Sequence, residues 1–128
     1  MVNEMPKQGI FCWNELVTPD TVKAKKFYTE LLGWTAVEMP MSSGTYTVFK
    51  VGETNAGGMY QITEQMGKVP PHWMGYITVD DVDAMVKKTE KLGGKVCMPP
   101  MDVPGVGRMA MITDPTGATI ALMTLEKM

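Results

Sequence analysis

Two side chains in this sequence could act in acid–base catalysis, His72 and Glu15. His72 is the only histidine, and because an imidazole titrates near neutral pH it could serve as a general base. A structural or surface role is the alternative for this residue. With a single histidine, one chain cannot build a metal site from several imidazoles.

Glu15 belongs to residues 10–18, whose alternation predicts a strand with Phe11, Trp13, Glu15 and Val17 on one face. A carboxylate among aromatic rings is expected to have a raised pKa through desolvation, which suits a general base. The alternative is a carboxylate that pairs with a basic group such as Arg108 and only orders the sheet.

Arg108 is the only arginine of the chain. Its forked guanidinium could hold a substrate carboxylate through two hydrogen bonds. An internal partner, either Glu15 or Asp102, is equally compatible with the sequence. The preceding Gly105-Val106-Gly107 is too short for a phosphate-binding loop.

Aromatic and thioether side chains could line a site for a small molecule. The chain has 14 methionines, and methionine is common on adaptable apolar binding surfaces. An apolar surface with a few polar tips is the usual make-up of a small-molecule site, whereas a filled core or a subunit interface is the alternative. The side chains in question are Trp13, Tyr60, Met74, Tyr76, Met109 and Met111.

Composition limits the classes of protein that this chain can belong to. A length of 128 residues predicts a single domain, residues 1–128. The net charge of −2 without runs of like charge argues against a nucleic-acid partner, and no apolar stretch is long enough for a membrane span. Cys12 and Cys97 suit neither a disulfide framework nor a zinc ribbon. A cytoplasmic protein without a signal peptide is therefore expected.

The chain repeats itself with a shift of sixty residues. The clearest matches are Leu32-Gly33 with Leu92-Gly93 and Pro40-Met41 with Pro100-Met101. Two modules, about residues 9–63 and 72–125, are therefore expected. Two unrelated strand–helix units are the alternative.

Each module has the predicted order strand, helix, strand, strand, strand. Asp20 is the expected N-cap of the first helix and Gly33 its C-terminal stop, while Asp80 or Asp81 caps the second helix and Gly93-Gly94 ends it. The predicted strands are residues 10–18, 34–39, 45–51 and 57–62, then 72–79, 95–98, 108–113 and 118–125.

Several motifs together carry a family resemblance, over residues 9–125. They are residues 20–34, Val79-Asp80-Asp81-Val82-Asp83, Leu92-Gly93-Gly94 and Asp114-Pro115-Thr116-Gly117-Ala118. The chain resembles the vicinal oxygen chelate superfamily, which includes glyoxalase I, bleomycin resistance proteins and extradiol dioxygenases. The resemblance implies an α+β fold of two βαβββ modules that form a curved mixed sheet around a cleft, and a homodimer. It also turns the face that carries Glu15 toward the cleft.

Metal-using members of this superfamily place ligands on the first and last strands of each module. The resemblance puts these positions at Trp13, Met74, Tyr60 or Gln61, and Ala121. Indole, thioether and methyl groups do not bind a hard divalent ion, so we expect no metal and no other cofactor.

Three functions remain open from the sequence. The first is a metal-independent protein that binds a small apolar or aromatic molecule through Trp13, Glu15, Tyr60, Met74, Tyr76, Arg108 and Met111. The second is an enzyme of the same superfamily, a lyase, isomerase or dioxygenase-like protein. It would use Glu15 or His72 as base, or a metal held by unusual ligands such as Glu15, Gln61 and His72. The third is an interaction module that pairs through its sheet edges.

Overall fold

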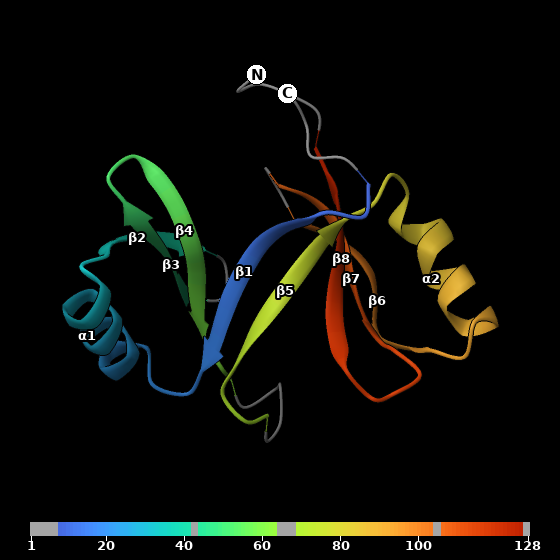
Figure 1. Cartoon of the computed structure of the whole chain (residues 1–128), viewed down its shortest axis with the longest axis horizontal. Helices are drawn as coiled ribbons and strands as arrows, with labels where there is room; N and C mark the ends of the chain where they lie inside the picture. The colour runs from blue at the N-terminus through green and yellow to red at the C-terminus, as the bar shows by residue number, and fades with distance from the viewer. Residues whose placement is uncertain (1–7, 42–43, 64–68, 104–105, 127–128) are drawn as a thin grey trace. The chain divides into compact units, whose positions relative to one another are not determined.

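The computed structural model describes residues 8–41, 44–63, 69–103 and 106–126. These residues form eight strands and two helices (Figure 1). They fall into two compact units. We call Trp13–Met74 the first unit, and the described residues on either side of that segment the second unit.

The first unit has a four-stranded sheet in the order β2-β3-β4-β1. β1 and β4 run parallel, and the other neighbours are antiparallel. Its elements are β1 (Phe11–Thr18, whose first two residues lie in the second unit), α1 (Thr21–Leu32), β2 (Thr35–Met41), β3 (Gly44–Val51) and β4 (Thr54–Gln61).

Helix α1 begins and ends where the sequence predicts. The Asp20 side chain accepts a hydrogen bond from the Lys23 amide at 2.9 Å, which satisfies a free donor of the first turn. Gly33 ends the helix in the left-handed conformation, with φ of 72°. The helix covers one face of the sheet, where Leu16, Phe49 and Met59 form a core that Ala24, Tyr28 and Trp34 pack against.

The outer part of α1 differs from the sequence pattern. Phe27, Leu31 and Leu32 share the helical spacing of core positions, but they are 57, 62 and 50 % exposed. The contact with the core runs through a narrow stripe that contains Ala24 and Tyr28. Helical spacing alone does not give the width of the buried stripe, because the bulky Tyr28 and Trp34 rings fill the space beneath the helix.

The second unit repeats this plan with the sheet order β5-β8-β7-β6, in which β5 and β8 are parallel. Helix α2 contributes Val82 to a core that also contains Val79, Ala110 and Leu122. The elements are β5 (His72–Thr78, whose first three residues lie in the first unit), α2 (Val82–Lys91), β6 (Lys95–Val103), β7 (Gly107–Thr113) and β8 (Thr119–Leu125).

The N-cap of α2 is Asp81, whose side chain accepts from the Ala84 amide at 3.2 Å. The two helix caps are therefore 61 residues apart, Asp20 and Asp81, whereas the glycines that follow the helices, Gly33 and Gly93, are 60 apart. An alignment at the caps thus pairs Trp13 with Met74, Glu15 with Tyr76, and Val17 with Thr78. The α+β class with two βαβββ modules is confirmed.

Strand β6 is longer than predicted. The strand was predicted to end at Met98, and the two residues that follow, Pro99-Pro100, cannot donate to a sheet ladder. The strand instead continues to Val103, with irregularities in its pairing to β7 between Val96 and Met98 and between Met98 and Met101. This is possible because β6 is an edge strand, as is β2, which contains Pro40. No helix in the described part of the chain is long and apolar enough to cross a membrane.

Candidate functional site

A buried carboxylate lies on the face of the first unit's sheet that points away from α1. Glu15 is 6 % exposed, and alternation along β1 puts it opposite Leu16, which packs under the helix. The Tyr46 hydroxyl donates to Glu15 Oε2 at 2.6 Å and accepts from Trp13 Nε1 at 2.8 Å. Because an indole N–H can only donate, this chain of hydrogen bonds runs from Trp13 to Tyr46 to Glu15.

Gly58 makes this arrangement possible. It pairs with Glu15 on β1 and with Val48 on β3, so it lies between the strands that carry the carboxylate and the tyrosine. A Cβ atom at position 58 would be 1.8 Å from the Tyr46 hydroxyl oxygen and 2.4 Å from Cζ. The tyrosine ring therefore crosses β4 directly above the glycine and reaches Glu15.

Tyr46 and Gly58 were absent from the residues that sequence reasoning selected. A signal was available, since a glycine inside a strand often marks a site where another group approaches closely. That group could not be identified from local sequence, because the approach depends on the pairing between strands β3 and β4.

The tyrosines of this face resist ionisation. Burial raises the pKa of Tyr46 far above its usual range, and the negative charge of Glu15 adds to the effect. Burial and the same charge raise the pKa of Tyr60 to about 12. Both phenols are thus neutral at physiological pH.

A spectroscopic titration of phenolate absorbance is expected to separate these two tyrosines. Tyr60→Phe should remove a step with a midpoint near pH 12, whereas Tyr46→Phe should leave the titration below that pH unchanged. A raised folded-state pKa also means that the unfolded chain loses its protons first. The free energy of unfolding should therefore fall as the pH rises above about 10. A Tyr46 step near pH 10 would contradict the burial described here.

Tyr60, rather than Gln61, shares the face of Glu15. Tyr60 pairs with Val17 and with Tyr46 across the ladder. The Gln61 side chain lies on the other face, where its Oε1 accepts from the Thr21 amide at 3.3 Å and its Nε2 donates to the Pro19 carbonyl. The structure thus brings Trp13, Glu15 and Tyr60 together on one face.

His72 and Met74 lie on β5 in the part that belongs to the first unit. Trp73 between them points to the α1 side, where its indole N–H donates to the Tyr28 hydroxyl at 3.2 Å. Alternation therefore puts His72 and Met74 on the opposite side. Met74 is 4 % exposed, and His72 is half-buried with Nδ1 at 2.8 Å from the Pro70 carbonyl oxygen.

The second unit carries an unusual concentration of methionines on the face away from α2. Two cross-strand rows run through it, from β6 across β7 and β8 to β5. Ala110 and Leu122, which alternate with these residues, pack toward α2. We call this surface the methionine face; its rows are Met98, Met111, Ala121, Tyr76 and Met101, Met109, Met123, Thr78.

Arg108 does not lie on the methionine face. It alternates with Met109 and points to the α2 side, where Nε and Nη2 donate to Asp83 at 2.8 and 3.0 Å. Nη1 donates to Asp102 at 3.0 Å, so the internal partner proposed from the sequence is present, together with a second one in Asp83. Arg108 and Met111, expected in one site, therefore lie on opposite faces of β7.

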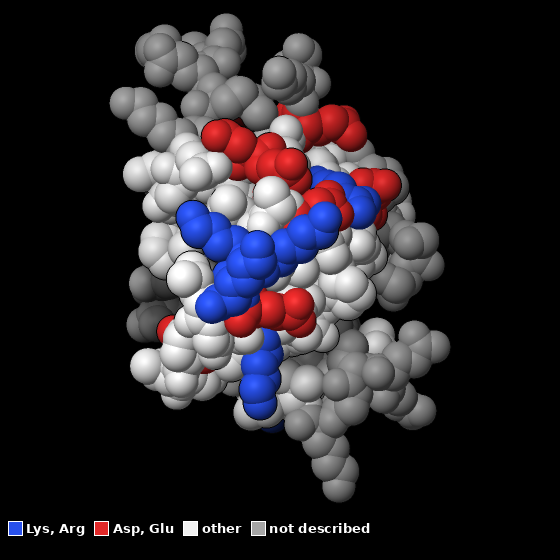
Figure 2. Space-filling view, turned by 90° about the vertical axis from the view of Figure 1, so that its right-hand side faces the viewer, with Lys and Arg blue, Asp and Glu red and all other residues white. Residues whose placement is uncertain are grey.

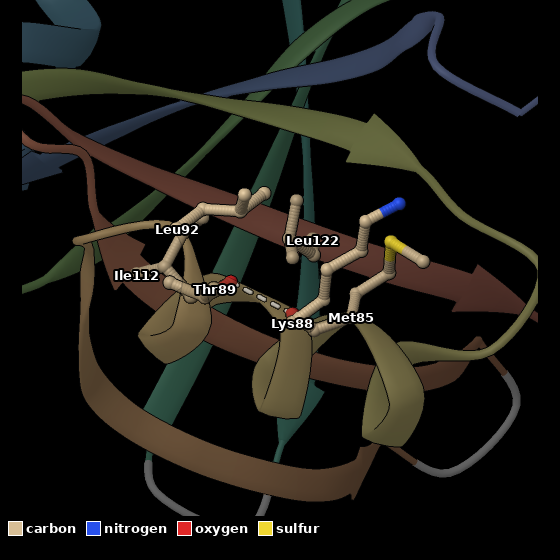
Figure 3. A pocket seen from close by; sticks show the side chains of 6 residues that line it. All are labelled: Met85, Lys88, Thr89, Leu92, Ile112 and Leu122. Atoms are coloured by element: carbon tan, nitrogen blue, oxygen red, sulfur yellow. Dashed lines mark hydrogen bonds between the residues drawn. The ribbon is translucent and has the colours of Figure 1, made fainter.

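A shallow apolar groove of about 300 Å³ lies between α2 and the sheet (Figure 3). Its only charged lining residue is Lys88; the others are Met85, Thr89, Leu92, Ile112 and Leu122. Figure 2 shows that Lys and Arg side chains on this side of the molecule are interspersed with Asp and Glu. The basic side chains form a band across this side, and acidic side chains border the band.

The residues present do not fit the divalent metal that the resemblance implies. At the implied positions, the Trp13 indole can only donate, Ala121 has no donor atom, and the Tyr60 phenol keeps its proton. Across the described segments, no three His, Cys, Asp or Glu side chains gather in a group that could hold a metal ion. The absence of a metal remains a prediction for experiment.

Comparisons with known proteins agree on one family. The family model described as Glyoxalase/Bleomycin resistance protein/Dioxygenase superfamily matches residues 11–122. The chain is 42% identical over 120 residues to a candidate glyoxylase, CFP32 of Mycobacterium tuberculosis (strain CDC 1551 / Oshkosh), covering 91% of this chain and 46% of the relative. It is 40% identical over 128 residues to the anthracycline biosynthesis protein DnrV of Streptomyces peucetius, covering 89% of this chain and 46% of DnrV.

Structural comparison supports the fold. Methylmalonyl-CoA epimerase from Mycobacterium tuberculosis superposes with a TM-score of 0.64 at 17% sequence identity, covering 98% of this chain and 96% of the epimerase. The chain spans about half the length of the curated relatives it matches. From the family match and these relatives, the chain belongs to the Glyoxalase/Bleomycin resistance protein/Dioxygenase superfamily.

Proposed function

We propose that this protein binds a small, largely apolar or aromatic molecule without using a metal ion. The observation that carries the proposal is the methionine face, where five methionines and Tyr76 occupy two adjacent rows of one sheet. Thioethers are polarizable, adapt their shape and make favourable contacts with aromatic rings. Side chains of this composition therefore suit a flat apolar ligand better than a charged one.

The relatives are compatible with such a ligand. DnrV carries the name of an anthracycline biosynthesis protein, and anthracyclines are aromatic molecules. A homodimer, a cytoplasmic location and the absence of nucleic-acid partners remain predictions from the sequence, and light scattering of the purified chain tests the first of them.

A second candidate is an enzyme of the same family in which Glu15 accepts a proton from the substrate. The buried position of Glu15 and its short hydrogen bond from Tyr46 favour it, because a catalytic base must be held in place by its surroundings. Glu15→Gln separates the two functions. It should abolish turnover if Glu15 is a base, whereas binding of an apolar ligand to the second unit should change little.

Metal analysis tests the metal-independent proposal directly. Untagged protein should contain far less than one equivalent of metal, and Ni, Zn, Mn, Fe(II) or Mg should not raise its melting temperature. The physical reason is the poor donor set at the implied ligand positions. One equivalent of retained metal, or a saturable rise in melting temperature, would contradict the proposal and favour the enzyme.

A further inference from the structure

The hydroxyl group of Thr78 is buried without a hydrogen-bond partner. Thr78 is 6 % exposed, and its Oγ1 is the one buried side-chain oxygen or nitrogen in the described residues that has no partner. The backbone of Thr78 is satisfied, since its amide donates to Ile10 at 2.9 Å and its carbonyl accepts from Gly9 at 2.8 Å. Only the side chain lacks a partner, and such groups in native proteins call for a specific explanation.

The fold itself does not require a hydroxyl at this position. Alignment of the helix caps Asp20 and Asp81 pairs Thr78 with Val17, which is 3 % exposed in the first unit. Valine has nearly the shape of threonine and carries no polar group. The same strand position is thus filled by an apolar side chain in one module and by an unpaired hydroxyl in the other.

Thr78 lies at the inner end of a row of the methionine face. Ile77 and Val79 pack toward α2, so alternation turns Thr78 to the opposite side, beside Met123. Exposure rises along this row from 6 % at Thr78 and Met123 to 9 % at Met109 and 47 % at Met101. The side chains of this row are therefore buried at β5 and exposed at β6.

We propose that Thr78 is a ligand contact, and that the ligand is a neutral aromatic molecule with an oxygen atom that hydrogen-bonds to Thr78 Oγ1. This inference rests on the proposed function and specifies its ligand class. The side chains of both rows are uncharged, so they offer no counter-charge to an ionic group.

Two probes that differ in one oxygen test the inference. 9-Fluorenone has a ketone oxygen that fluorene lacks, and the two have similar ring systems. Calorimetry with the full chain should show about tenfold tighter binding of fluorenone than of fluorene, because one hydrogen bond contributes about that factor to affinity. Thr78→Val should abolish this preference without weakening fluorene binding. Thr78→Ser, which keeps the hydroxyl, should preserve it.

The outcomes separate this inference from the proposed function. If both probes bind equally well to the wild type, or if Thr78→Val keeps the preference, the role of Thr78 is wrong and apolar binding stands. If neither probe binds, both proposals fall. Thr78→Val should also melt at the same or a higher temperature than the wild type. A clearly lower melting temperature would mean that the hydroxyl has a structural partner, such as a buried water, and would overturn the inference.

Discussion

Gly58→Ala is expected to destabilise the first unit by more than about 3 kcal/mol, which is a large effect for the addition of one methyl group. The new Cβ would lie 1.8 Å from the Tyr46 hydroxyl oxygen, 2.4 Å from Cζ and 2.9 Å from Cε2, so the ring has to leave its position. Its departure removes the acceptor of Trp13 and a donor to the buried Glu15. The loss of a hydrogen bond to a buried group adds to the steric cost.

A double-mutant cycle shows whether the loss of stability comes from the clash with Tyr46 or from any substitution of Gly58 in β4. Urea unfolding should be measured for Gly58→Ala, for Tyr46→Ser and for the double variant. With the ring absent, the alanine is expected to cost less than about 1 kcal/mol, so the two changes should be strongly non-additive. Equal costs in both backgrounds would show that Tyr46 does not cross β4 above Gly58.

Phe49→Ala is expected to cost about 3–5 kcal/mol of unfolding free energy, because it removes a large side chain from a packed core. Phe49 is fully buried, and its ring centroid lies 5.0 Å from that of Trp34 and 6.2 Å from that of Tyr28. The cavity would lie beneath α1, whose attachment to the sheet depends on these aromatic contacts. Denaturant unfolding measures the loss.

Phe27→Ala is the matched control for this prediction. Phe27 is also aromatic and contacts Tyr28 edge to face, but it is 57 % exposed. Its replacement should therefore cost less than about 1 kcal/mol. Similar losses for Phe27→Ala and Phe49→Ala would mean that α1 packs on the sheet through a different stripe.

Much of the fold could be predicted from the sequence because its signals are local. Asp20 and Gly33 mark the ends of α1 through hydrogen bonds and a backbone conformation that involve only nearby residues. Alternation likewise put Glu15 and Trp13 on one face of β1. The end of strand β6 was predicted too early. Proline lacks the amide hydrogen that a second neighbouring strand would need, but an edge strand has only one neighbour, so Pro99 and Pro100 do not end it.

The candidate site was less predictable because it depends on pairing between distant segments. Tyr46 is 31 residues from Glu15, and only the register of β3, β4 and β1 brings them together. The choice between Tyr60 and Gln61 depended in the same way on a register of one residue. Arg108 was grouped with Met111 because of its chemistry, although the odd spacing of three residues already implies opposite faces of a strand.

The prolines of the edge strands have a consequence for how the protein behaves at high concentration. Pro40 in β2 and Pro99-Pro100 in β6 interrupt the row of amide hydrogens that an incoming strand would need. Aggregation by strand addition is therefore disfavoured at both edges, and the same gaps disfavour peptides that bind by extending a sheet. In each unit, the prolines of the edge strand therefore disfavour pairing with a second copy of the chain.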